Sequence, residues 1–217
     1  MEKIKIKLPG VNDFFSQEAY KSLRTNLLFC GQDVQVIAFT SCEENEGKTT
    51  VSLHTAKSLS ELGKKVLFID ADMRKSVMAG RNSNVRNVMG LSEMLTGMAK
   101  VSDCLYTTQY PNLDIIFAGS FPPNPVELLG GKYFTSFVNE ARKSFDYIII
   151  DTPPLGMVID AAVISSCCDG MVIVVNCGKA RYHQVQEVIG QLEKSGSKIL
   201  GVVRNNSDLP KKGYYQR

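Results

Sequence analysis

Hydrophobic residues in this chain form short, unbroken runs that are separated by longer amphipathic segments. The first clear run contains Val34, Val36, Ile37 and Phe39, and it gives way to a polar turn. Apolar runs without alternation are typical of parallel strands that are covered on both faces. We expect strands at residues 34–39, 65–70, 112–119, 145–151, 170–176 and 198–204.

The segments between these runs have the period of a helix. Tyr20, Leu23 and Leu27 would share one face of the first helix, and Gly63 would terminate the second. We expect helices at residues 13–29, 49–62, 91–97, from 127 onward, 160–168 and 181–194. The alternation predicts an α/β protein of three layers, with a mostly parallel central sheet and helices on both faces.

The 217 residues fit one domain of ordinary size. We expect this domain to span residues 1–206, beginning with an extended arm at 1–12 and the first helix, and we expect 207–217 to be a flexible tail without apolar periodicity. Residues 75–111 predict a polar loop before the helix at 91–97. Asn124 and Pro125 suit the cap and first turn of a helix that starts at Glu127, and Gly130-Gly131 would weaken its early turns.

A phosphate-binding loop is the first candidate site. The polar turn closes on Gly47-Lys48-Thr49-Thr50 between a strand and a helix, which is the order such a loop requires. Lys48 would reach the β- and γ-phosphates, and the Thr49 hydroxyl would complete a Mg²⁺ shell. Cys42 replaces the usual first Gly, and a bare GK[ST] is common by chance. The loop residues expected to bind ATP are Cys42, Glu43, Glu44, Asn45, Glu46, Gly47, Lys48, Thr49 and Thr50.

Carboxylates follow two of the predicted strands. Asp70 and Asp72 end the run at 65–70, and Asp151 ends the run at 145–151. Open α/β sheets bind ligands at the carboxyl ends of their strands. An Asp-x-Asp at a strand end is usually a turn or a helix cap, but one crossover after a phosphate loop it favours a metal and catalytic site. Asp151 has the Walker B arrangement and could hold the water shell of Mg²⁺.

Composition excludes several classes of protein. Hydrophobic residues make up 44% and charged residues 22%, which is typical of a globular chain, and the net charge of +3 is too small to imply nucleic acid. No window approaches the ~20 apolar residues of a membrane span, so we expect a cytoplasmic protein. The six cysteines lack metal or disulfide spacing, although the loop position of Cys42 could favour its thiolate.

Three motifs in this order, GKT, IDADMR and IIIDTPP, resemble the P-loop tyrosine kinases of bacterial capsule and exopolysaccharide synthesis. The strand that ends Asp-x-Asp-x-Arg is similar to the Walker A′ motif of that family and discriminates best. The sequence EAYKSLRTN at 18–26 resembles the family's N-terminal ExxRxxR helix, and the similarity extends along nearly the whole chain. The resemblance implies a P-loop NTPase fold and an ATP-dependent protein tyrosine kinase that phosphorylates itself.

The resemblance also implies roles for individual residues. Lys48 would bind phosphate and Thr49 would ligate Mg²⁺. Asp70 would orient or deprotonate the acceptor tyrosine, while Asp72 and Asp151 would support the metal. These groups form a sufficient set, because phosphoryl transfer needs mostly positioning and charge neutralisation.

The nucleotide base would be bound elsewhere. Asn205 matches the adenine-reading Asn of the family, but the Arg that usually follows it is Asn206 here.

A charged stripe on the first helix has two interpretations. Glu18, Lys21 and Arg24 recur every three residues, which makes a stripe about 120° wide. From the residues alone it could be a solvated face with a local Glu–Lys pair. The resemblance implies instead that it is the contact of a homo-oligomeric ring, in which this motif docks beside the site of the next subunit.

The resemblance implies a membrane partner as well. A transmembrane polysaccharide co-polymerase would supply the anchor and activate the kinase through its cytoplasmic tail, so the kinase would be peripheral at the inner face of the cell membrane. The acceptors would be Tyr214 and Tyr215. An extended chain from Asn206 to Tyr215 spans about 30 Å, which permits phosphorylation in trans.

Departures from the family pattern leave alternatives open. Glu44-Asn45 replaces Pro-Gly, although Asn tolerates a left-handed backbone, and Glu43 and Glu44 would oppose a polyphosphate unless they point outward. Lys21 replaces an Arg.

One alternative is a partition or septum ATPase switch, but Glu43 stands where that class carries its signature Lys. Another is a non-catalytic scaffold of the capsule machinery, which only the altered loop favours.

Overall fold

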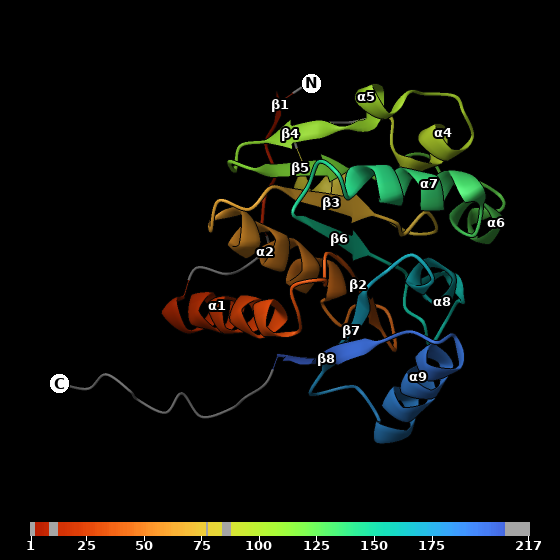
Figure 1. Ribbon diagram of the computed structural model, residues 1–217. Coiled ribbons are helices and arrows are strands. Elements are labelled where there is room, and N and C mark those ends of the chain that lie inside the picture. Colours follow the sequence, from red (N-terminus) through yellow and green to blue (C-terminus); the bar gives the residue numbers. More distant parts are fainter. Residues whose placement is uncertain (1–2, 9–12, 77, 84–87, 207–217) are drawn as a thin grey trace.

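The computed structural model describes residues 3–8, 13–76, 78–83 and 88–206. Within these residues the strands form one eight-stranded sheet in the order β1-β4-β5-β3-β6-β2-β7-β8 (Figure 1). All neighbouring strands run parallel except β4 and β5. The strands are β1 Lys3–Ile4, β2 Val36–Ser41, β3 Val66–Asp70, β4 Tyr106–Thr108, β5 Leu113–Ile116, β6 Tyr147–Asp151, β7 Gly170–Asn176 and β8 Ile199–Asn205.

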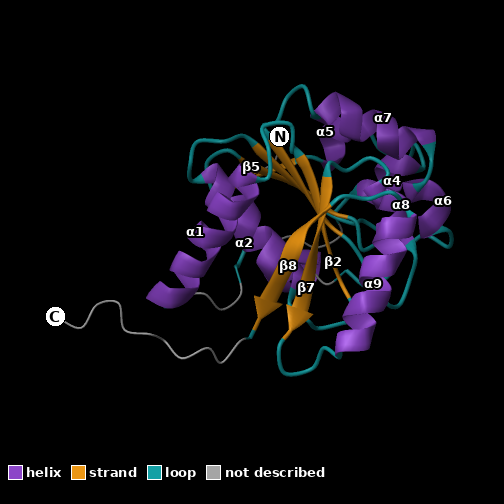
Figure 2. Cartoon of the chain, turned by 60° about the horizontal axis from the view of Figure 1, so that its bottom comes forward, coloured by secondary structure: helices purple, strands orange, loops and turns teal. Residues whose placement is uncertain are grey.

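Helices cover both faces of this sheet, as the sequence predicted. Figure 2 shows α1 and α2 on one face and the helices from α4 to α9 on the other. The helices are α1 Phe14–Phe29, α2 Lys48–Ser60, α3 Met78–Asn82, α4 Leu91–Leu95, α5 Val101–Cys104, α6 Pro125–Leu129, α7 Lys132–Ala141, α8 Asp160–Ser165 and α9 Tyr182–Lys194. Among the described residues, no helix combines the length and the apolar character that a bilayer crossing needs.

The central strands are buried from both sides. In β2, Val36 and Ala38 pack into the core beneath α4–α9, whereas Ile37 and Phe39 pack into the core beneath α1 and α2. All four side chains are completely buried. This arrangement explains why the strands lack a polar alternate position, and it confirms the prediction made from the unbroken apolar runs.

The first helix begins where the sequence predicted. Asp13 caps α1 by accepting a hydrogen bond from the Ser16 N–H at 3.0 Å. The second helix, α2, starts at Lys48 and ends at Ser60, slightly short of the predicted end. Gly63 adopts a φ of 79° in the turn that follows, a conformation that glycine tolerates without steric cost.

The prediction of one helix from Glu127 was wrong. The helix α6 begins at Pro125, and Asn124 precedes it without a capping hydrogen bond from its side chain. The helix α6 ends at Leu129 and Gly130 caps it, and Gly131 then precedes the new helix α7. The two glycines therefore divide the segment into two helices, because neither has a side chain to favour continuing the first.

The predictions missed the far edge of the sheet. The strand β1 lies in the expected extended arm and pairs in parallel with β4, which falls in the segment predicted as a loop. Gln109 fixes the arm by accepting from the Ile6 N–H at 2.8 Å and donating to the Ile6 carbonyl. Both strands are too short to have a recognisable period. The helices α3 and α5 were missed for the same reason.

The strand order places three motifs together. The strands β3, β6 and β2 are neighbours, and all three run in the same direction. In register, Asp151 of β6 lies opposite Phe39 of β2 on one side and Asp70 of β3 on the other. The phosphate loop and both carboxylate motifs therefore meet at one edge of the sheet.

Candidate active site

The loop between β2 and α2 has the backbone of a phosphate-binding loop. Asn45 adopts a φ of 62° and Gly47 a φ of 90°, which confirms that Asn45 tolerates the left-handed turn. A Cβ at position 47 would lie 2.0 Å from the side-chain nitrogen of Asn205, and the positive φ would strain any residue with a side chain, so glycine suits this position. The helix α2 then starts directly at Lys48, with its first N–H groups facing the loop.

Glu46 holds this loop from inside. Its carboxylate is 2% exposed and accepts hydrogen bonds from the backbone N–H groups of Cys42 at 2.7 Å and Glu43 at 2.9 Å. Its second oxygen accepts from the Asn176 N–H at the end of β7, at 3.2 Å. The sequence placed Glu46 among the ATP-binding residues, but this carboxylate binds the loop itself and ties it to the sheet.

Lys48, Thr49 and Asp151 form the centre of the site. The Lys48 ammonium lies 2.9 Å from Oδ1 of Asp151, and the Thr49 hydroxyl donates to Oδ2 at 2.5 Å. Burial raises the pKa of Asp151, although Lys48 and Thr49 oppose the shift. The sequence predicted that these three residues would act together, and the structure brings them into direct contact.

Asp70 lies beside this centre, opposite Asp151 in the neighbouring strand. It is 1% exposed, and burial together with the neighbouring charge of Asp151 raises its pKa to about 7. A hydrogen bond from the Ser76 hydroxyl acts in the opposite direction. A carboxyl group with a pKa near neutrality can exchange a proton with a substrate, which fits the role predicted for Asp70.

Asp72 occupies the mouth of the site rather than its floor. Its Oδ1 accepts from the backbone N–H groups of Arg74 at 3.3 Å and Lys75 at 3.0 Å. These bonds shape the turn after β3. A turn is one of the usual roles of an Asp-x-Asp at the end of a strand. The second carboxylate oxygen has no hydrogen bond recorded among the described residues.

A cavity of about 700 Å³ lies over these groups. The predicted loop residues from Glu43 to Thr50 all line it, as do Asp72 and Arg74. Its other wall comes from the segment after β6, at Pro153, Pro154, Met157 and Val158. Asp70 and Asp151 are buried beneath it. The volume suits a ligand the size of a nucleotide.

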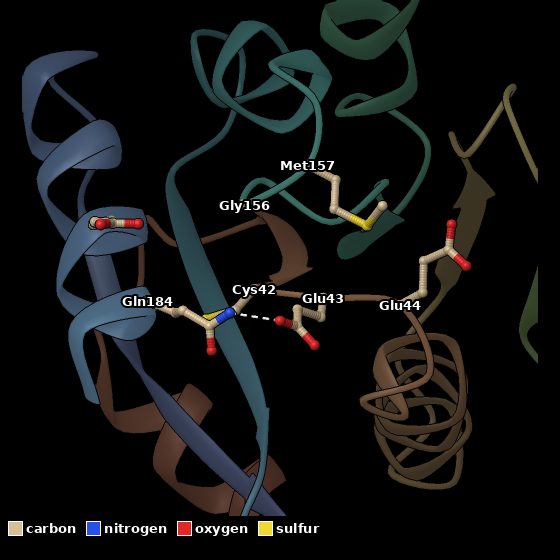
Figure 3. A pocket seen from close by; sticks show the side chains of 7 residues that line it. Cys42, Glu43, Glu44, Gly156, Met157 and Gln184 are labelled. Atoms are coloured by element: carbon tan, nitrogen blue, oxygen red, sulfur yellow. Dashed lines mark hydrogen bonds between the residues drawn. The ribbon is translucent and has the colours of Figure 1, made fainter. Parts of the chain in front are cut away.

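Cys42 lies outside this cavity, in a smaller one that adjoins it (Figure 3). Glu43 accepts from Gln184 of α9, and Glu44 pairs with the Lys75 ammonium at 2.6 Å. The two additional carboxylates of the loop therefore have partners outside it. The position of Cys42 in the loop does not favour its thiolate, because burial and the nearby Glu46 raise the pKa of Cys42 to about 12.

Asn205 also lies against the phosphate loop. Its side-chain amide donates to the carbonyl of Glu46 at 2.9 Å. In this structure the predicted adenine-binding residue thus supports the loop. Reading of the base by its carbonyl oxygen stays a prediction.

The predicted oligomer contacts divide into two kinds. Glu18 and Lys21 form an exposed ion pair at 2.7 Å on α1. This is the local Glu–Lys pair on a solvated face that the residues alone predict. Arg24 is half-buried and donates to the carbonyl of Ser58 in α2 at 2.9 Å. Its contact is therefore inside its own chain. The predicted acceptors Tyr214 and Tyr215 lie outside the described residues.

Sequence reasoning missed three functional contacts in this region: the carboxylate of Glu46 on the loop N–H groups, the Ser76 hydroxyl on Asp70, and the ion pair of Arg74 with Asp160. Ser76 had one local signal, because it lies six residues after Asp70 in the same loop. Glu46 is local as well, because it lies three and four residues after the N–H groups that it accepts from. The pair of Arg74 and Asp160 joins residues whose meeting depends on how the strands are ordered. Motif spacing contains no information about that order.

The fold and this loop define a P-loop nucleotide-binding protein of the α/β class. A family model described as an AAA domain matches residues 34–200. The chain is 43% identical over 190 residues to the tyrosine-protein kinase CpsD of Streptococcus agalactiae, covering 88% of this chain and 83% of CpsD. The chain belongs to this family of bacterial tyrosine-protein kinases.

Solved structures agree with this assignment. The chimerical protein CapA2B2 superposes with a TM-score of 0.86 at 30% identity, covering 95% of this chain and 94% of the other. The septum site-determining protein MinD of Pyrococcus horikoshii OT3, complexed with Mg-ADP, has a lower TM-score of 0.65 at 26% identity, covering 80% of this chain and 72% of MinD. The chain therefore shares the P-loop fold with septum ATPases but is more similar to the kinase family.

Proposed function

We propose that this protein is an ATP-dependent protein tyrosine kinase that phosphorylates its own C-terminal tyrosines and regulates capsular or exopolysaccharide synthesis and export. The observation that carries the proposal is the register of β3 and β6. It places the buried Asp70 directly opposite Asp151, which holds Lys48 and Thr49 of the phosphate loop. A proton acceptor thus lies next to a phosphate-binding centre.

The proposed reaction is an in-line phosphoryl transfer. The phenolic oxygen of tyrosine attacks the γ-phosphorus of ATP, the bond from that phosphorus to the β-phosphate oxygen breaks, and ADP leaves. The phenolic proton passes to the Asp70 carboxylate. Lys48 and the N–H groups at the start of α2 bind the phosphates and hold the γ-phosphorus in line.

The side chains of this site fit a Mg²⁺ ion. Thr49, Asp72 and Asp151 provide the oxygen donors that this ion prefers, and Thr49 already lies against Asp151. Within the described residues, no group of three His, Cys, Asp or Glu side chains could hold a metal unaided. A bound Mg²⁺ ion would be held by one or two of these carboxylates together with phosphate oxygens, and it would neutralise charge on the phosphates.

The proposal includes a ring in which the tail of one subunit enters the site of the next. It also includes a transmembrane co-polymerase whose cytoplasmic tail activates the kinase and brings it to the membrane. The family resemblance supports both parts. The exposed pair of Glu18 and Lys21 on α1 is available for such a contact.

Mass mapping of phosphotyrosine tests the activity. The purified protein, mixed with the partner's cytoplasmic tail, Mg²⁺ and ATP, should acquire phosphotyrosine at Tyr214 and Tyr215. Lys48→Met should abolish the signal, because the ammonium that holds the phosphates is gone. Phosphotyrosine that persists after Tyr214→Phe and Tyr215→Phe would contradict the acceptor assignment.

The similarity to MinD supports a second candidate, a nucleotide-driven switch. ATP hydrolysis without phosphotyrosine, under the same conditions, would favour it. Neither hydrolysis nor phosphotyrosine, with the fold intact, would favour a scaffold. The same assay therefore separates all three functions.

A further inference from the structure

Arg74 connects a buried carboxylate to the wall of the nucleotide cavity. Its Nε donates to Oδ1 of Asp160 at 2.9 Å. Asp160 is completely buried at the start of α8, whereas the Arg74 side chain is 38% exposed and lines the cavity over Lys48 and Asp72. The ion pair therefore fixes an arginine at the mouth of the site.

This ion pair uses one donor of the guanidinium. An arginine has five N–H donors and often binds a carboxylate through two parallel bonds. Here Oδ2 of Asp160 is buried and has no partner among the described residues. Among the described residues, the bond from Nε to Asp160 is also the only hydrogen bond that the Arg74 side chain makes. The terminal amino groups are thus not used on Asp160 and stay available to a ligand.

The charges in the cavity indicate what the terminal amino groups of Arg74 could bind. Three lysines line the cavity, and two of them, Lys48 and Lys75, are already paired with Asp151 and Glu44. During transfer the phosphoryl group spreads its negative charge over three oxygens. An arginine beside those oxygens would stabilise them in addition to Lys48, because its terminal amino groups need not give up a partner first.

We propose that Arg74 binds the γ-phosphoryl group through its terminal amino groups while the bond to the β-phosphate oxygen breaks and the bond to the tyrosine oxygen forms. Asp160 is the positioning residue that holds the guanidinium through Nε. This inference rests on the proposed phosphoryl transfer. Arg74, in the Walker A′ motif after β3, would then be a second cationic group at the phosphates, in addition to Lys48 of the phosphate loop.

Calorimetry with a transition-state analogue tests the role of Arg74. In Arg74→Gln, the affinity for ADP with Mg²⁺ and aluminium fluoride should fall about 100-fold, while the affinity for ADP alone changes less than about 3-fold. Turnover should fall about 10³-fold. Lys143→Gln, which removes a charge from an exposed pair far from the cavity, is the matched control and should change neither affinity. Equal losses for ADP and the analogue would overturn the proposal.

Two further variants separate positioning from mere structure. Asp160→Asn should lower kcat about 10-fold at an unchanged KM for ATP, and millimolar guanidinium chloride should restore part of the activity of Arg74→Ala. A fall in melting temperature with kcat unchanged, or no rescue, would show that the ion pair only joins two loops. ATP hydrolysis is measured beside phosphotyrosine. If the protein hydrolyses ATP without acting as a kinase, phosphotyrosine is absent, and the effect of Arg74 is still visible in the rate of hydrolysis.

Discussion

At the scale of single residues, Glu46 shows how a phosphate-binding loop can keep its shape without the usual glycine at position 42. Its carboxylate accepts three backbone N–H groups, two from the loop and one from β7. Hydrogen bonds to an ionised acceptor are stronger than neutral ones, and burial protects them from water. Glu46 therefore provides the rigidity that glycine geometry provides in the common form of the loop.

Glu46→Gln should destabilise both the loop and the protein. An amide has one acceptor oxygen, and its NH₂ group would face a backbone N–H, so the free energy of unfolding should fall by about 1–3 kcal/mol. Nucleotide affinity should fall as well. Urea unfolding and nucleotide titration measure the two effects. Glu61→Gln, in an exposed pair on α2, is the control, and similar values for both variants would contradict this account.

At the scale of elements, Asp169 joins α7 to the start of β2. Arg142, at the end of α7, grips its carboxylate with two bonds of 2.7 and 2.8 Å. The same carboxylate accepts from the N–H groups of Gln35 and Val36. Burial opposes its ionisation, but these four bonds outweigh burial and hold the pKa of Asp169 below its ordinary value.

A lowered pKa makes this junction sensitive to acid. The unfolded chain binds the proton more readily than the folded one, so the stabilisation is complete above the ordinary pKa of about 4 and is lost as the pH falls through the lowered value. Asp169→Asn should therefore cost about 1–3 kcal/mol at pH 7 and progressively less below about pH 4.

Urea unfolding across this pH range measures the difference between Asp169→Asn and the unaltered protein. A difference that stays constant with pH would refute the assignment. Glu140→Gln, which alters an exposed pair with Lys143, should show little difference at any pH.

At the scale of the whole molecule, the helix α1 has two different surfaces. One surface packs on α2, where Tyr20 stacks on His54 with ring centres 4.6 Å apart and Arg24 donates to the Ser58 carbonyl. The other exposes the pair of Glu18 and Lys21 to solvent. Of the three predicted contact residues, Glu18 and Lys21 can be changed without disturbing how α1 packs within its own chain, whereas Arg24 cannot.

Removing this pair should reduce the oligomer without unfolding the subunit. Exposed ion pairs contribute about 0–1 kcal/mol to stability, so Glu18→Ala with Lys21→Ala should leave the melting temperature nearly unchanged. The molar mass in multi-angle light scattering should fall if this surface forms the ring contact. Arg24→Ala is the contrasting variant and should lower the melting temperature, and a double variant of unchanged mass would rule the contact out.

Much of the fold and of the site could be predicted because the signals are local. The run from Val36 to Phe39 has no polar alternate position, and this alone indicates a strand buried on both faces. The consecutive residues Gly47, Lys48 and Thr49 after such a run predict the phosphate-binding loop, because the geometry of this loop depends on the backbone of a single turn. The segment predicted as one helix from Glu127 was misjudged because two glycines can either weaken a helix or divide it, and local pattern does not distinguish these outcomes.

The sequence by itself determined which residues form the loop between β2 and α2, because a strand, a tight turn and a helix start are contiguous in the chain. It also determined that Asp70 and Asp151 end buried strands. Only the tertiary structure decided that β3 and β6 are neighbours, and that Glu46 and Arg74 find partners at Asn176 and Asp160. Those contacts join residues far apart in the chain, and they depend on the packing of the whole sheet rather than on any local preference.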